Sequence, residues 1–137
     1  MVSIPSCNPH VSDGDESELA QFLKEELEEA GLQVELQQVT SEYHRAFTEH
    51  KSYTRPNVIA RIGREGGAKL ILNGHIDTVS GDTMKGAFDP RVVSDKLFGR
   101  GSADMKGGIA SMLAATEAVR ESNLSLKGEL VLSLVVD

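Results

Sequence analysis

The chain has 137 residues and a formal net charge of −7, and this acidic balance argues against nucleic acid and anionic membranes as partners. Its apolar content of 39% and charged content of 26% are ordinary for a globular protein with one buried core. No apolar run reaches the ~18 residues that a membrane helix needs, and the N-terminus lacks the basic and apolar regions of a signal peptide. Cys7 is the only cysteine, so an intrachain disulfide is excluded and a cytoplasmic location is expected.

The first predicted helix covers residues 13–30 and follows a polar loop over residues 3–12. Asp13 and Glu16 resemble a capping box at its start, and Gly31 is the expected cap residue at its end. One face of this helix is apolar with a spacing of three and four residues, whereas acidic side chains cover much of the remainder. The apolar positions are Leu19, Phe22, Leu23, Leu27 and Ala30.

Three strands are predicted in the next part of the chain, at residues 33–39, 57–62 and 68–73. The first alternates between apolar and polar residues, and the second begins after Pro56. Short turns that contain glycine favour antiparallel pairing between neighbouring strands in this part of the chain. The third strand contains the apolar run Leu-Ile-Leu at residues 70–72, which we expect to be buried.

A long loop is predicted over residues 78–99, and a second helix follows within residues 104–123. Its expected buried face consists of residues at helical spacing, namely Ile109, Met112, Leu113, Thr116 and Val119. The last strand, residues 129–136, has a continuous apolar run that is typical of a central strand covered on both faces. The order of the elements therefore predicts an α/β fold with a mixed sheet and packed helices.

Polar side chains with metal-binding chemistry follow the ends of the predicted strands. His75 and Asp77 lie two residues apart, so in extended backbone their side chains point to the same side. A neutral imidazole can bind a metal through one nitrogen while a nearby carboxylate accepts its other N–H. Asp104 follows a Gly-rich turn, and its two oxygens could bridge two metal ions about 3.5–4 Å apart. These residues and Asp137 are expected to meet in one crevice beyond the strand ends.

Each of these residues also has a purely structural interpretation. Taken alone, His75 could be a hydrogen-bonded histidine at a strand end, and Asp104 could be a helix N-cap. Their combination favours metal binding, because the glycines before Asp104 allow unusual backbone conformations close to a metal.

The sequences GHIDTV (residues 74–79) and GRGSADMKGG (residues 99–108) resemble the paired metal motifs of the dinuclear zinc amidohydrolase and exopeptidase family. This family includes acetylornithine deacetylase, succinyl-diaminopimelate desuccinylase, aminoacylase and the carboxypeptidase G type enzymes. Ile4-Pro5-Ser6 and Arg55-Pro56-Asn57 also match landmarks of the family. The resemblance covers nearly the whole chain and implies part of a zinc-exopeptidase-like catalytic domain.

The resemblance implies hydrolysis of amide bonds in N-acyl amino acids or small peptides at two Zn²⁺ ions, with Co²⁺ or Mn²⁺ as alternatives. His75 would be a terminal ligand of one metal, and Asp104 would bridge both metals. Asp77 is the predicted catalytic residue, which would orient His75. Adjacent glutamates, expected directly after Asp137, would supply the general base and a further ligand. The peptide bond between Asp104 and Met105 is expected to be cis.

Residues 1–137 are expected to form only the N-terminal part of this catalytic domain, because family members are several hundred residues long. The dimerisation domain and the C-terminal half would be absent, and the complete protein is expected to be a homodimer. One His and one Asp cannot fill two roughly four-coordinate sites, so the fragment is expected to bind metal weakly and to be inactive. Two alternatives remain open: a non-catalytic binding module that retains half a metal site, and a truncated product without a function of its own.

Overall fold

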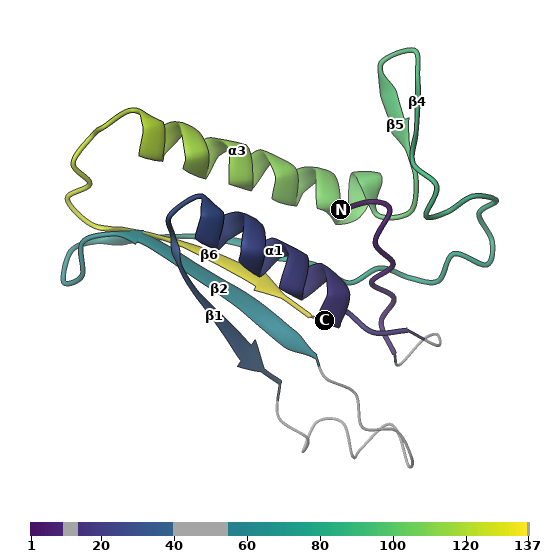
Figure 1. Cartoon of the computed structure of the whole chain (residues 1–137), viewed down its shortest axis with the longest axis horizontal. Helices are drawn as coiled ribbons and strands as arrows, with labels where there is room; N and C mark the ends of the chain where they lie inside the picture. The colour runs from purple at the N-terminus through teal and green to yellow at the C-terminus, as the bar shows by residue number, and fades with distance from the viewer. Residues whose placement is uncertain (10–13, 40–54, 137) are drawn as a thin grey trace.

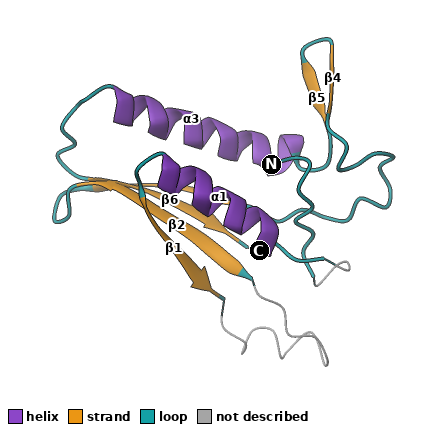
Figure 2. Ribbon diagram, viewed as in Figure 1, coloured by secondary structure: helices purple, strands orange, loops and turns teal. Residues whose placement is uncertain are grey.

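The structure is a computed structural model that describes residues 1–9, 14–39 and 55–136. It is an α/β fold in which both helices lie on the same side of a four-stranded sheet (Figure 1), and Figure 2 shows the same arrangement by type of element. The predicted fold class is thus confirmed. In chain order the elements are α1 (Ser17–Glu29), β1 (Gln33–Gln38), β2 (Pro56–Gly63), β3 (Lys69–His75), β4 (Arg91–Val93), β5 (Lys96–Phe98), η1 (Ser102–Lys106), α3 (Gly107–Glu121) and β6 (Glu129–Val135).

The last strand in the chain, β6, lies inside the sheet, whose strand order is β1-β2-β6-β3. It pairs antiparallel with β2 and parallel with β3. The expected antiparallel pairing is confirmed for β1 and β2 but is wrong for β2 and β3, which β6 separates. The short turn after β2 does not decide the pairing, because the apolar β6 gains more by burial between two strands.

The prediction that residues 70–72 are buried is also wrong. Leu70 and Ile71 are 62% and 59% exposed. The reason is the position of β3 at the edge of the sheet, where β6 flanks it on one side only. An apolar run in a sequence therefore identified the strand correctly but not its burial.

Helix α1 packs its predicted apolar face onto the sheet and ends as expected at Gly31. The Gly31 N–H donates to the Glu28 carbonyl (2.8 Å) and the Leu32 N–H donates to the Leu27 carbonyl (3.0 Å), with Gly31 at φ +82°. This is the hydrogen-bond pattern of a Schellman motif. The core joins this helix to the sheet and to α3, and it contains Leu19, Ala20, Leu23, Leu27, Leu32, Val58, Ala60, Ile76, Ile109, Leu132 and Leu134.

The predicted capping box does not form at the start of α1. Asp13 lies outside the described residues, and the Glu16 side chain makes no capping bond. Asp15 accepts a hydrogen bond from the Ser17 N–H instead (2.8 Å). Glu16 points into the interior, where it meets Arg55.

A short hairpin, β4–β5, interrupts the region that was expected to be a continuous loop. Ser94 and Asp95 form its turn with φ values of +48° and +61°. Positive φ at both central residues is the geometry of a two-residue hairpin turn. Figure 1 shows the hairpin projecting away from the sheet and the helices. Within the described ranges, no helix has both the length and the apolar character needed to cross a bilayer.

Candidate metal centre

His75 is the last residue of β3, at the end where the parallel strand β6 also finishes. Its backbone N–H donates to Met105 Sδ (3.2 Å), so the end of β3 contacts η1 directly. Gly74 permits this contact, because a Cβ at that position would lie 2.9 Å from Met105 Cε. The missing side chain at residue 74 therefore lets η1 lie against the end of β3.

Asp104 reaches the same place from η1, where its backbone is not helical (φ −130°, ψ 98°). The peptide bond between Asp104 and Met105 is cis, which confirms that prediction. Asp104 Oδ1 lies 2.9 Å from His75 Nε2. The Asp104 side chain is 88% exposed and that of His75 is 31% exposed. The two residues predicted as metal ligands thus converge at an accessible position.

Asp77 lies on the opposite side of the His75 ring. The Asp77 backbone carbonyl is 3.0 Å from His75 Nδ1, and the nearer carboxylate oxygen is 3.5 Å from the same nitrogen. When Nδ1 carries the proton it donates to this carbonyl, which leaves Nε2 free to bind a metal. The structure therefore brings Asp77 to the position from which it can orient His75, with its main chain closer than its carboxylate.

The electrostatic environment of His75 favours positive charge at this point. Burial by itself would lower the pKa of the imidazole. The hydrogen bond with Asp104 and the negative charges of Asp77 and Asp104 outweigh it and raise the pKa above the usual 6.5. A cation of any kind between these groups would be stabilised by the same two carboxylates.

The donor chemistry of His75 and Asp104 fits two ligands of one zinc ion. Imidazole nitrogen and carboxylate oxygen bind zinc at about 2.0–2.2 Å, so two of them on a tetrahedral ion lie roughly 3.3 Å apart. The observed distance of 2.9 Å between the two atoms is close to that value. Within residues 1–9, 14–39 and 55–136, no group of three or more His, Cys, Asp and Glu side chains could hold a metal ion. The described residues therefore supply part of a metal centre.

The segment that contains both motifs, residues 71–137, matches the description of peptidase family M20/M25/M40. It belongs to this family. A peptidase M20 domain-containing protein of Schizosaccharomyces pombe is 36% identical over 124 residues, which cover 90% of this chain and 27% of that protein. A succinyl-diaminopimelate desuccinylase of Methylorubrum populi is 37% identical over 120 residues, which cover 85% of this chain and 27% of that protein. The resemblance drawn from the two motifs is thereby confirmed.

Solved structures agree with the M20 assignment at the level of the fold. Human carnosine dipeptidase 1 matches with a TM-score of 0.73 and 20% identity over 98% of this chain and 29% of its own. A di-peptidase of Saccharomyces cerevisiae matches with a TM-score of 0.74 and 19% identity over 98% of this chain and 30% of its own. The chain thus spans 27% to 30% of the length of these four M20 relatives and structural neighbours.

A buried ion pair lies close to the M20 motifs, and the sequence interpretation missed it. Arg55 Nη2 donates to Glu16 Oε1 (2.7 Å), and the Glu16 side chain is completely buried. Burial raises the pKa of Glu16 above 4.5, the Arg55 hydrogen bond offsets this in part, and the charge of Asp77 raises the pKa further. The pair therefore lies within electrostatic reach of Asp77. The match of Arg55 to a family landmark was the only indication of this pair in the sequence.

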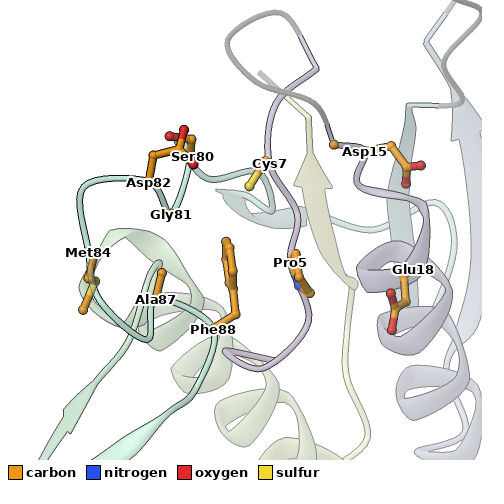
Figure 3. Close-up of a pocket in the computed structure, with 11 residues that line it drawn as sticks. Pro5, Cys7, Asp15, Glu18, Ser80, Gly81, Asp82, Met84, Ala87 and Phe88 are labelled. Atoms are coloured by element: carbon orange, nitrogen blue, oxygen red, sulfur yellow. The ribbon is translucent and has the colours of Figure 1, made fainter.

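A pocket of about 670 Å³ lies beside the metal centre, between the N-terminal segment, the start of α1 and the loop after β3 (Figure 3). Phe88 and Pro5 form apolar parts of its lining, and Asp15, Glu18 and Asp82 contribute carboxylates. His75, Asp77 and Asp104 are not among the described residues that line it. The pocket is thus adjacent to the candidate metal centre but separate from it.

The turn before Asp104 depends on Gly101, and replacement of this residue by alanine is expected to destabilise the protein. Gly101 has φ +78°, and a Cβ there would lie 2.8 Å from Thr78 Cγ2 and 3.2 Å from Lys106 Cδ. Gly101→Ala should therefore reduce the free energy of unfolding by about 1–3 kcal/mol more than positive φ alone explains. Urea denaturation measures the difference.

Gly66→Ala is the matched control for Gly101→Ala. Gly66 has a similar φ of +85°, but a Cβ there would meet no atom within 4 Å. The two variants therefore share the backbone strain and differ in the steric clash. Equal losses of stability in the two variants would show that the turn before Asp104 has room for a side chain.

Proposed function

We propose that the protein containing these residues is a metal-dependent hydrolase of amide bonds in N-acyl amino acids or small peptides. The observation that carries the proposal is the 2.9 Å separation of His75 Nε2 and Asp104 Oδ1, which come from two different motifs. The desuccinylase and dipeptidase names of the relatives support the same class of substrate.

In the proposed reaction His75 binds one metal ion through Nε2, and Asp104 bridges two metal ions with its two oxygens. Asp77 keeps the proton on Nδ1 through its carbonyl and carboxylate, so that Nε2 stays available to the metal. Two bound Zn²⁺ ions, or Co²⁺ or Mn²⁺, would supply a water of lowered pKa and polarise the scissile carbonyl. The general base that receives the proton is proposed to be a glutamate that follows β6.

The complete enzyme is proposed to be a cytoplasmic homodimer in which residues 1–137 are part of the catalytic domain. The two candidate ligands are fewer than one four-coordinate zinc site requires. We therefore expect the 137 residues alone to bind metal weakly and to be inactive. This expectation is tested by comparing their zinc content and hydrolysis rate with those of a longer protein that contains them.

Hydrolysis of a substrate panel tests the proposed reaction. The panel contains N-succinyl and N-acetyl amino acids and dipeptides, and the released amine is measured with and without added Zn²⁺. We expect turnover of at least one of these classes, complete loss of turnover with a chelator, and recovery when Zn²⁺ is restored. A metal-loaded protein that binds these compounds without cleaving them would instead favour the non-catalytic binding module.

A further inference from the structure

The first eight residues of the chain, here called the N-terminal strap (residues 1–8), lie beside the segment that carries Asp77. The Thr78 N–H donates to the Ser6 carbonyl (2.8 Å), and the Asn8 N–H donates to the Thr78 carbonyl (3.0 Å). The buried Ser6 hydroxyl donates to the Ile76 carbonyl (2.8 Å). These bonds fix the residues on both sides of Asp77 to the strap.

The second motif is attached to the same strap through Lys106. This side chain is only 1% exposed, and its Nζ donates to the Ile4 carbonyl (2.7 Å) and the Met1 carbonyl (3.2 Å). Lys106 comes two residues after Asp104 and belongs to the same segment, η1. The strap therefore contacts both motifs at once.

A buried lysine needs an explanation, because lysine is almost never fully buried and its burial costs free energy. A methionine or leucine would fill the same volume without that cost. What the ammonium adds is direction, since it donates to two main-chain carbonyls of the strap. The exposed Asp104 side chain has no such fixed attachment of its own to the interior.

We propose that Lys106 is a positioning residue that holds η1 on the N-terminal strap and so sets the separation of Asp104 from His75. The inference rests on the proposed function, because that separation matters only if the two side chains share a metal ion. It assigns to the strap the role of a common support for the two metal motifs, in addition to its part in the fold.

The test replaces Lys106 by methionine, which keeps the length of the side chain and removes the ammonium. Zinc affinity of Lys106→Met, measured by competition with a chelating dye, is expected to fall by about 10- to 100-fold, the range seen when groups that orient ligands are removed. The visible absorption of the Co²⁺-loaded protein should change in position or intensity, because the ligand geometry changes. The melting temperature of the metal-free protein should be unchanged or higher, because an apolar side chain is cheaper to bury.

Two further variants make the result specific. Lys96→Met removes an exposed lysine from β5 and should leave zinc affinity and the Co²⁺ spectrum as in the wild type. Ser6→Ala removes the strap bond to Ile76 and should weaken zinc binding in the same direction. Together with Lys106→Met its effect should be less than the product of the two separate effects, because both act through the strap.

The outcomes separate failure of this inference from failure of the proposed function. If the wild type binds Zn²⁺ and cleaves substrate, but Lys106→Met matches it in affinity and Co²⁺ spectrum, Lys106 has no positioning role. If Lys106→Met does not fold, an unchanged zinc affinity in Ser6→Ala overturns the inference equally. If the wild-type protein binds neither Zn²⁺ nor Co²⁺, the proposed function itself is refuted.

Discussion

Replacing Asp104 by asparagine is expected to reduce kcat/KM by on the order of 10³-fold or more, equivalent to about 4 kcal/mol of transition-state stabilisation. Asparagine has nearly the same shape, but it lacks the two anionic oxygens with which Asp104 would bridge two metal ions. Since the side chain is 88% exposed, the substitution should not lower the stability of the metal-free protein. Metal content by elemental analysis should fall together with activity, and His75→Ala should act in the same way.

Asp95→Asn is the matched control for Asp104→Asn, because Asp95 is also exposed and asparagine tolerates its positive φ of +61°. It should retain wild-type metal content and activity. Asp77→Asn is expected to fall between the two, with a loss of about 10- to 100-fold, because Asp77 acts on the metal only through His75. Full metal content and activity in Asp104→Asn would contradict the assignment of Asp104 as a ligand.

Replacing Arg55 by methionine is expected to destabilise the protein by about 3–5 kcal/mol, because it leaves the Glu16 carboxylate buried without its partner. Burial already raises the pKa of Glu16, so loss of the Arg55 hydrogen bond should favour its neutral form still more. Urea denaturation at neutral pH measures the free energy of unfolding. The combined variant Arg55→Met, Glu16→Leu should recover much of the loss, since it removes both buried charges.

Arg61→Met provides the comparison for Arg55→Met. Arg61 also pairs with a glutamate, Glu35, but at 3.5 Å and with both side chains exposed. Such a surface pair contributes about 0–1 kcal/mol, so its loss should have little effect on stability. A similar cost for Arg55→Met and Arg61→Met would show that the buried pair is not a stabilising feature of the fold.

Much of the fold follows from patterns that are local in the sequence. The helical spacing of Leu19, Leu23 and Leu27 and the apolar run of β6 depend on neighbouring residues, and both predictions are confirmed. The position of β3 does not follow from local patterns, because a strand with Leu70 and Ile71 is apolar whether it lies inside the sheet or at its edge. The β4–β5 hairpin was missed because its strands have three residues each, although Ser94-Asp95 between two Val and two apolar residues is a turn pattern.

The candidate site could be predicted only where its residues lie in recognisable motifs. His75, Asp77 and Asp104 do, and the structure brings all three together. Glu16 and Lys106 act through contacts with residues far away in the chain, and nothing in their sequence neighbourhood indicates those partners. Glu16 was even assigned to a helix cap, because a Glu near a helix start fits that local role equally well.

The place of β6 in the sheet bears on the order in which the molecule folds. The strands that flank it, β2 and β3, have no pairing with each other, so the sheet stays in two pieces until the last strand enters. Such pairing between distant parts of a chain is slow, because a long loop must close before any contact forms. It follows that His75, at the end of β3, acquires its fixed distance from the Glu16–Arg55 side of the sheet only when synthesis has passed residue 135.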